Sequence, residues 1–99
     1  MRIHVVRSGG IAGLRSEVDL DTSSLPEPLS SALAGLVERA SFFGLAEELR
    51  SRLPDVTQYR VRIEDDQRAH EVCFDDACSD ETLLELMERI TEATKAAAR

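Results

Sequence analysis

Residues 3–20 read IHVVRSGGIAGLRSEVDL, and this stretch decides the fold. Residues 3–6 are rich in β-branched side chains, while residues 14–20 alternate charged side chains with apolar or small ones. An alternation of period two is typical of a strand that buries one face. Glycines separate the two segments, so we expect a hairpin whose connection, Arg7 to Leu14, is longer than the usual two-residue turn.

A second alternation follows in the latter half of the chain. The apolar positions are Tyr59, Val61 and Ile63, and then His70, Val72 and Phe74. The intervening residues 65–68, which read DDQR, are typical of a turn. We therefore expect a second hairpin with one apolar and one solvated face.

Helical spacing appears between the two hairpins. Residues 24–27, which read SLPE, predict a helix start, because Ser24 can cap the first turn and proline is tolerated there. Apolar residues at helical spacing continue to Ala40, and residues 41–44 are expected to interrupt the helix. Residues 45–53 predict a short second helical segment, ended by a proline.

A last helix is expected after Ser79 or Asp80, either of which can cap it. Its predicted inner stripe is Leu83, Leu84, Met87 and Ile90. Residues 93–99 are expected to form a frayed tail of a single domain, 1–99. The order ββα(α)ββα predicts an α+β fold: a four-stranded, mainly antiparallel sheet with two main helices packed on one face.

Charge and composition limit the function classes. The formal net charge is −7, from 19 acidic and 12 basic residues, so we expect neither nucleic acid nor an anionic membrane as partner. Residues 1–10 contain no signal-peptide core, and no apolar run is long enough to span a bilayer. We therefore expect a cytoplasmic protein whose Cys73 and Cys78 are reduced thiols, with a disulfide between them as the alternative.

No metal or cofactor site is expected. The candidate ligands His4, His70, Cys73 and Cys78 lack the spacing of zinc sites. His70 is instead interpreted as a partly buried structural histidine. The glycines of residues 9–13 follow a strand as in phosphate loops, but the segment after them predicts a strand and not the helix that such loops need.

No catalytic centre is expected either, so we predict that the protein is not an enzyme. Ser8 does not lie in a nucleophile elbow, and Cys73 lies within a predicted strand beside acidic residues, where a thiol is a poor nucleophile. The carboxylate pairs 65–66, 75–76 and 80–81 are interpreted as solvated turns and a helix N-terminus.

The glycine-rich connection of the first hairpin is the candidate functional site. One interpretation is an exposed tip that offers Ile11 to the groove of a partner; the other is a demanding turn with Ile11 buried in the core. The candidate partner-binding residues are Arg7, Ser8, Gly9, Gly10, Ile11, Ala12, Gly13 and Leu14.

The whole chain resembles the emfourin-like family. The pattern I-x-V-x-R-S-G-G-[apolar]-A-G-[apolar] at residues 3–14 resembles the N-terminus of these proteins. The pair Phe42-Phe43, the strand Tyr59-x-Val61-x-Ile63 and the strand ending Phe74-Asp75-Asp76 follow in the same order. The two cysteines are outside the family pattern.

The resemblance implies a reversible protein inhibitor of a thermolysin-like zinc metallopeptidase of the protealysin type, in bacterial cytoplasm. Such peptidases bind extended substrates and favour a bulky apolar side chain after the scissile bond. For such a target, physical reasoning leads us to expect that Ile11 or Leu14 enters that pocket while the loop backbone pairs with the edge of the cleft. In an alternative arrangement, Glu17 or Asp19 approaches the catalytic zinc.

Two other function classes remain open. A non-inhibitory interaction module, antitoxin-like or an adaptor, would use the acidic surface and the sheet edges. A small enzyme or ligand binder would need a closed pocket lined by His4 or His70. Homodimerisation through a sheet edge or a helix face is compatible with inhibitor and module alike, and the turn at residues 65–66 is the next candidate site.

Overall fold

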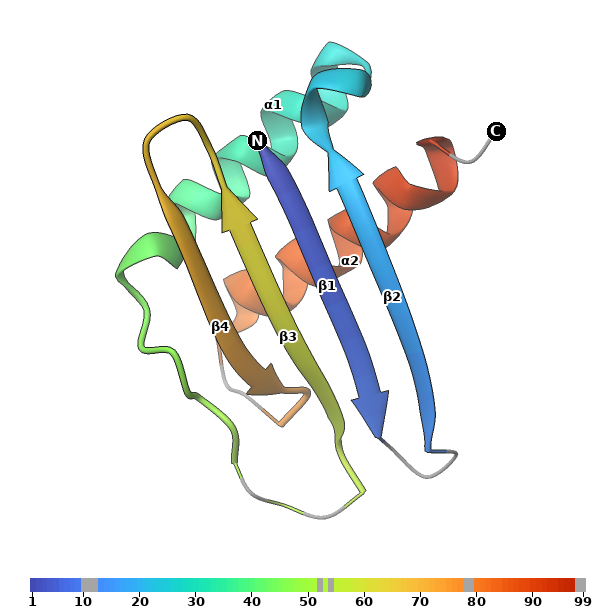
Figure 1. Cartoon of the computed structure of the whole chain (residues 1–99), viewed down its shortest axis with the longest axis vertical. Coiled ribbons are helices and arrows are strands. Elements are labelled where there is room, and N and C mark those ends of the chain that lie inside the picture. Colours follow the sequence, from blue (N-terminus) through green and yellow to red (C-terminus); the bar gives the residue numbers. More distant parts are fainter. Residues whose placement is uncertain (10–12, 52, 54, 78–79, 98–99) are drawn as a thin grey trace.

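The computed structural model describes residues 1–9, 13–51, 53, 55–77 and 80–97, and Figure 1 shows how its elements are arranged. The strands are β1 (Arg2–Gly9), β2 (Leu14–Asp21), β3 (Thr57–Glu64) and β4 (Ala69–Asp75), and the helices are α1 (Glu27–Arg39) and α2 (Glu81–Ala97). The strands form one antiparallel sheet in the order β2-β1-β3-β4. Both predicted hairpins and the α+β fold are therefore confirmed.

The alternation along the strands gives the sheet an apolar and a polar face. Val5 lies opposite Val18 on β2 and Val61 on β3, and Val61 lies opposite Val72 on β4. Figure 1 shows both helices behind the sheet. The burial of Val5, Val61 and Val72 places them on the face that the helices cover. The helices bury a stripe of apolar side chains against it: Leu33, Leu36, Val37, Leu83, Leu86, Met87, Ile90 and Ala93.

The first helix starts differently from the prediction. It begins at Glu27 after Pro26, and no side chain caps it. Ser24 ends a 3-10 turn instead, where its hydroxyl donates to the carbonyl oxygen of Asp21 at 2.8 Å. The carboxylate of Asp21 accepts the N–H of Ser23 at 3.0 Å, so the cap belongs to the 3-10 turn. A nearby acceptor thus engaged the serine that was expected to cap the helix.

The predicted interruption after α1 is confirmed, but the predicted second helix at residues 45–53 is wrong. Ser41 adopts a left-handed conformation with φ 51° and leads into a 3-10 turn at Phe42–Gly44. The following segment runs extended beside β4: the N–H of Leu49 donates to the carbonyl of Cys73 at 2.7 Å, and the N–H of Cys73 donates to the carbonyl of Glu47 at 2.8 Å. These main-chain bonds cover part of the β4 edge.

The final helix agrees with its predicted start. The carboxylate of Asp80 accepts the N–H of Leu83 at 3.1 Å, while Ser79 lies outside the described residues. The inner stripe also includes Leu86 and Ala93, both fully buried. The helix continues to Ala97, within the segment whose fraying stays a prediction. In the described part of the chain, neither helix has the length and apolar character of a membrane span.

Candidate functional site

The structure describes both stems of the glycine-rich connection. Arg7, Ser8 and Gly9 end β1, and Gly13 leads into β2, which starts at Leu14. Gly9 lies opposite Leu14, and on its other side it lies opposite Thr57 of β3. The hairpin is therefore held in register up to its last pair. The candidate residues at positions 10–12, including Ile11, lie outside the described residues, as does the side chain of Leu14.

Two of the glycines meet a backbone requirement of the turn. Gly9 has φ 86° and Gly13 has φ 62°, in the left-handed region that disfavours other residues. A Cβ atom on Gly9 would also approach the carbonyl oxygen of Val56 to 3.1 Å. These two glycines of the motif thus have a role in the fold, whatever the connection binds.

The strand alternation separates Arg7 and Ser8. Arg7 points to the face that the helices cover, where it lies opposite Tyr59 and its guanidinium sits over the tyrosine ring, 5.6 Å from the centroid. Ser8 points to the opposite face, between Arg15 on β2 and Gln58 on β3. The two candidate residues therefore cannot act on one ligand atom, and each belongs to a different surface.

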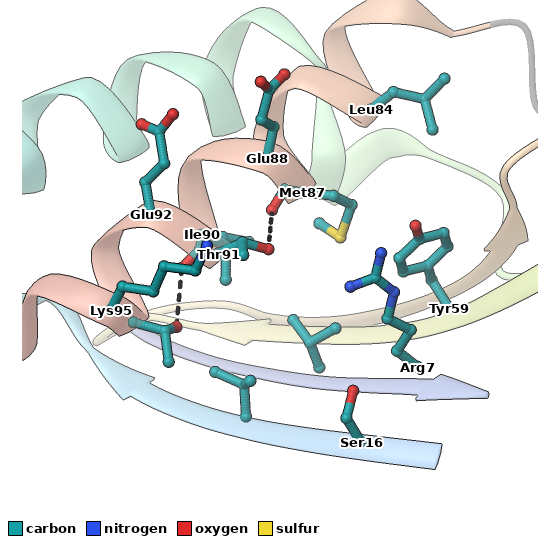
Figure 2. A pocket seen from close by; sticks show the side chains of 13 residues that line it. Arg7, Ser16, Tyr59, Leu84, Met87, Glu88, Ile90, Thr91, Glu92 and Lys95 are labelled. Carbon is teal, nitrogen blue, oxygen red and sulfur yellow. Dashed lines mark hydrogen bonds between the residues drawn. The ribbon is translucent and has the colours of Figure 1, made fainter. Parts of the chain in front are cut away.

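A half-open groove adjoins Arg7. Both helices cross the sheet obliquely, and the sheet end that carries the first hairpin extends beyond them (Figure 1). The resulting groove, about 620 Å³, lies between this end and α2 and is lined by Val5, Arg7, Val18, Tyr59, Leu84 and Met87, among others. Figure 2 shows the guanidinium of Arg7 turned towards Met87 and Tyr59.

Three of the polar side chains that line this groove are engaged within α2 or point away from the groove. The Thr91 hydroxyl donates to the carbonyl of Met87 at 3.0 Å and the Thr94 hydroxyl to that of Ile90 at 2.8 Å, both within α2. Figure 2 shows Glu88 pointing away from the groove. The apolar side chains of Val5, Val18, Leu84 and Met87 give the groove a surface on which an apolar side chain can pack.

The predicted histidine roles can be checked directly. His70 is half-buried, and its Nε2 lies 2.7 Å from the carbonyl oxygen of Leu45, which confirms its structural role. His4 faces the opposite side of the sheet, with its Nε2 2.9 Å from the Glu17 carboxylate. No group of three or more metal-ligating side chains occurs in the described residues, and Cys78 lies outside them.

One acidic residue was misassigned from the sequence. Asp75 is fully buried, so it is not a solvated turn residue, and its carboxylate accepts the N–H of Ser51 at 2.7 Å and the Ser51 hydroxyl at 2.6 Å. It thereby ties the segment beside β4 to the sheet. By contrast, Asp65 is a turn residue as predicted: it accepts the N–H groups of Gln67 and Arg68, and these bonds hold its carboxyl pKa below the usual value.

Fold and site together define a small α+β protein in which the paired end of the first hairpin lies beside a groove lined by apolar and polar side chains. The sequence model of the Emfourin family matches residues 5–91, most of the chain. This protein therefore belongs to the emfourin family, as the resemblance of its motifs predicted. Comparison with curated proteins and with solved structures gave no significant match.

Proposed function

We propose that this protein is a reversible inhibitor of a thermolysin-like zinc metallopeptidase of the protealysin type, acting in bacterial cytoplasm by binding and without catalysis of its own. The family match over residues 5–91 carries this proposal. In the proposed complex, the Arg7–Leu14 connection enters the active-site cleft of the peptidase, and Ile11 or Leu14 fills its apolar pocket.

The geometry of the stems supports this mode of binding. The first hairpin is paired up to Gly9 and Leu14, and Gly9 is paired with β3 as well, so the stems are fixed before binding. A connection held in this way loses less conformational entropy on association than a free peptide does. Arg7, packed over Tyr59, positions the stem from the inner face.

A carboxylate approach to the zinc is the second arrangement within the same proposal. Glu17 and Asp19 both lie exposed on the polar face of β2. Glu17 is nearer to the hairpin end but already contacts His4. Exchanging each for its amide separates the two arrangements, because Glu17→Gln or Asp19→Asn weakens inhibition only if that carboxylate faces the metal.

An inhibition titration tests the proposal. The wild-type protein is mixed at near-stoichiometric ratios with a panel of purified protealysin-like peptidases, and a peptide substrate reports activity. We expect Ile11→Asp to weaken inhibition at least about thirtyfold, the effect of losing an interface hot spot. Arg7→Ala is expected to weaken it less, through a looser stem. The matched control is Ala34→Asp, which adds the same charge on the exposed side of α1.

The outcomes of the titration test the inhibitor function and the location of the binding site separately. No loss of activity across the panel contradicts the proposed inhibitor role. Inhibition that is unchanged in both Ile11→Asp and Arg7→Ala, with folding intact, would place the site elsewhere, first at the turn at residues 65–66.

One observation favours the alternative of a non-inhibitory adaptor or antitoxin-like module: β2 is a terminal strand of the sheet. A pull-down that returns one non-peptidase partner would support that alternative.

A further inference from the structure

The polar face of the sheet carries a cluster of basic side chains at its hairpin end, which the proposed loop contacts do not involve. Ser8 lies there between Arg15 and Gln58 in register, and Arg60 lies two pairs further along β3, which is the next position on the same face. Arg50, from the segment beside β4, reaches over and its Nη1 donates to the side-chain oxygen of Gln58 at 3.4 Å. Three arginines from three segments thus converge beside the stem of the first hairpin.

These residues surround a shallow depression of about 140 Å³, which we term the arginine hollow and define by Ser8, Arg15, Arg50, Gln58 and Arg60. The whole chain has a formal net charge of −7. A concentration of cations at one end of such a molecule creates a local field opposite in sign to the average surface. The hollow is therefore suited to a partner group of negative charge.

Two of the three guanidinium groups are available to bind a negatively charged group of a partner. Arg50 is paired, since its Nη2 donates to the Glu48 carboxylate at 2.7 Å. Within the described part of the chain, neither Arg15 nor Arg60 makes an ion pair. The nearest acidic residue on β2, Glu17, is engaged with His4. Exposed arginines of this kind can bind carboxylates in a bidentate manner.

We propose that the arginine hollow is a second contact surface for the target peptidase and receives carboxylates from the rim of its active-site cleft. This inference rests on the proposed inhibitor function. Because Ser8 belongs both to the hollow and to the Arg7–Leu14 stem, a protein that encloses the hairpin end also meets Arg15 and Arg60. A polyanion such as nucleic acid would be repelled by the rest of the surface, whereas a few carboxylates at this end would not.

The test compares two double variants of equal net charge. Arg15→Glu/Arg60→Glu reverses the charge of the hollow, while Arg62→Glu/Arg89→Glu reverses two exposed arginines outside it, one further along β3 and one on α2. Each control arginine makes a surface ion pair, with Glu64 and with Glu92, so the folding of both variants is checked by urea denaturation first. Association rate constants with the most strongly inhibited peptidase are taken from progress curves at about 20 mM and about 500 mM NaCl. We expect the hollow variant to associate at least about tenfold more slowly at low salt, and within about twofold of wild type at high salt. The control should lose less than about threefold at low salt.

Each outcome bears on the inference. Equal rates for the two double variants, with inhibition by wild type intact, overturn the hollow as a contact and leave the inhibitor function standing. Failure of wild type to inhibit any peptidase overturns both. If the glutamate variant unfolds, Arg15→Gln/Arg60→Gln replaces it, with a smaller slowing expected. Saturable binding of orthophosphate by the free protein, lost in the glutamine variant, would overturn the proposal in favour of a small-anion site.

Discussion

Gly9 connects the sequence motif, the fold and the proposed site. It is the last paired residue of β1, with φ 86°, and its α-carbon faces the carbonyl oxygen of Val56. A side chain there meets two obstacles at once, an unfavourable backbone conformation and a close main-chain oxygen. The position therefore requires glycine for the fold, before any partner is considered.

A substitution of Gly9 tests whether the fold requires glycine at this position. We expect Gly9→Ala to lower the free energy of unfolding by about 1–2 kcal/mol, because the backbone must shift to relieve the strain. The control is Gly35→Ala inside α1, where a Cβ atom meets nothing within 4 Å. That exchange should raise stability by about 0.5–1 kcal/mol through helix propensity. Urea denaturation measures both, and a neutral Gly9→Ala would contradict the assigned backbone role.

Asp75 is the second residue with a testable structural role. Its carboxylate is fully buried and holds the N–H and hydroxyl of Ser51, so Asp75→Ala leaves those donors without their partner. We expect a loss of about 1–3 kcal/mol in urea denaturation. Asp76→Ala, at the exposed neighbouring position, should change stability by less than about 0.5 kcal/mol. Equal losses in the two variants would contradict the role of Asp75 as an anchor.

At the scale of elements, the sequence pattern predicted those strands and helices whose conformation depends on residues close by in the chain. The two hairpins were predicted because three of the strands alternate and the first, at residues 3–6, is rich in β-branched side chains. The segment after α1 was not, because Leu45 and Leu49 have helical spacing yet both pack against the core from an extended chain. The bonds that decide its conformation reach Cys73, far along the sequence, and no periodicity reports them.

The candidate site, too, could be predicted from the sequence only where it depends on nearby residues. Its stems and glycines were read from residues 7–14, but the groove beside Arg7 depends on how α2 crosses the sheet, which side-chain pattern does not specify. The arginine hollow likewise needs Arg50, which a helix at residues 45–53 would have placed elsewhere. Sequence thus located the hairpin end but not the surfaces around it.

The turn between β3 and β4 is expected to respond to acid. The pKa of Asp65 is lowered by the N–H bonds of Gln67 and Arg68, and then by the side chain of Arg68. A lowered pKa in the folded state means that the carboxylate stabilises the fold above its ordinary pKa and that this contribution is lost as pH falls. The stability difference between wild type and Asp65→Ala should therefore be full near pH 6 and shrink below about pH 4. Urea denaturation across this range tests it, and a difference that does not change with pH would contradict the assignment.

At the scale of the whole molecule, the two sheet edges differ. The β4 edge is partly covered by the extended segment at residues 47–49, whereas β2 is terminal and pairs with β1 alone among the described strands. Exposed acidic side chains line the polar face of β2, including Glu17 and Asp19. Charged side chains on an unpaired edge discourage a second copy from adding a strand, which favours a monomer that keeps its hairpin end accessible.

Removing those charges should promote self-association. We expect wild type to sediment as a monomer at about 100 μM and Glu17→Val/Asp19→Val to form dimers or larger species, because the edge then becomes apolar and unpaired. The control is Arg60→Val/Arg62→Val on β3, whose main chain is already paired on both sides, so two charged-to-valine exchanges there offer no free edge. The two double variants change the net charge in opposite directions, so they are compared at about 500 mM NaCl, where charge repulsion is screened. Sedimentation velocity distinguishes the three proteins. Self-association of both double variants to the same extent would show that general hydrophobicity, not the β2 edge, drives it. A dimer of the wild type at this concentration would contradict the expected monomer.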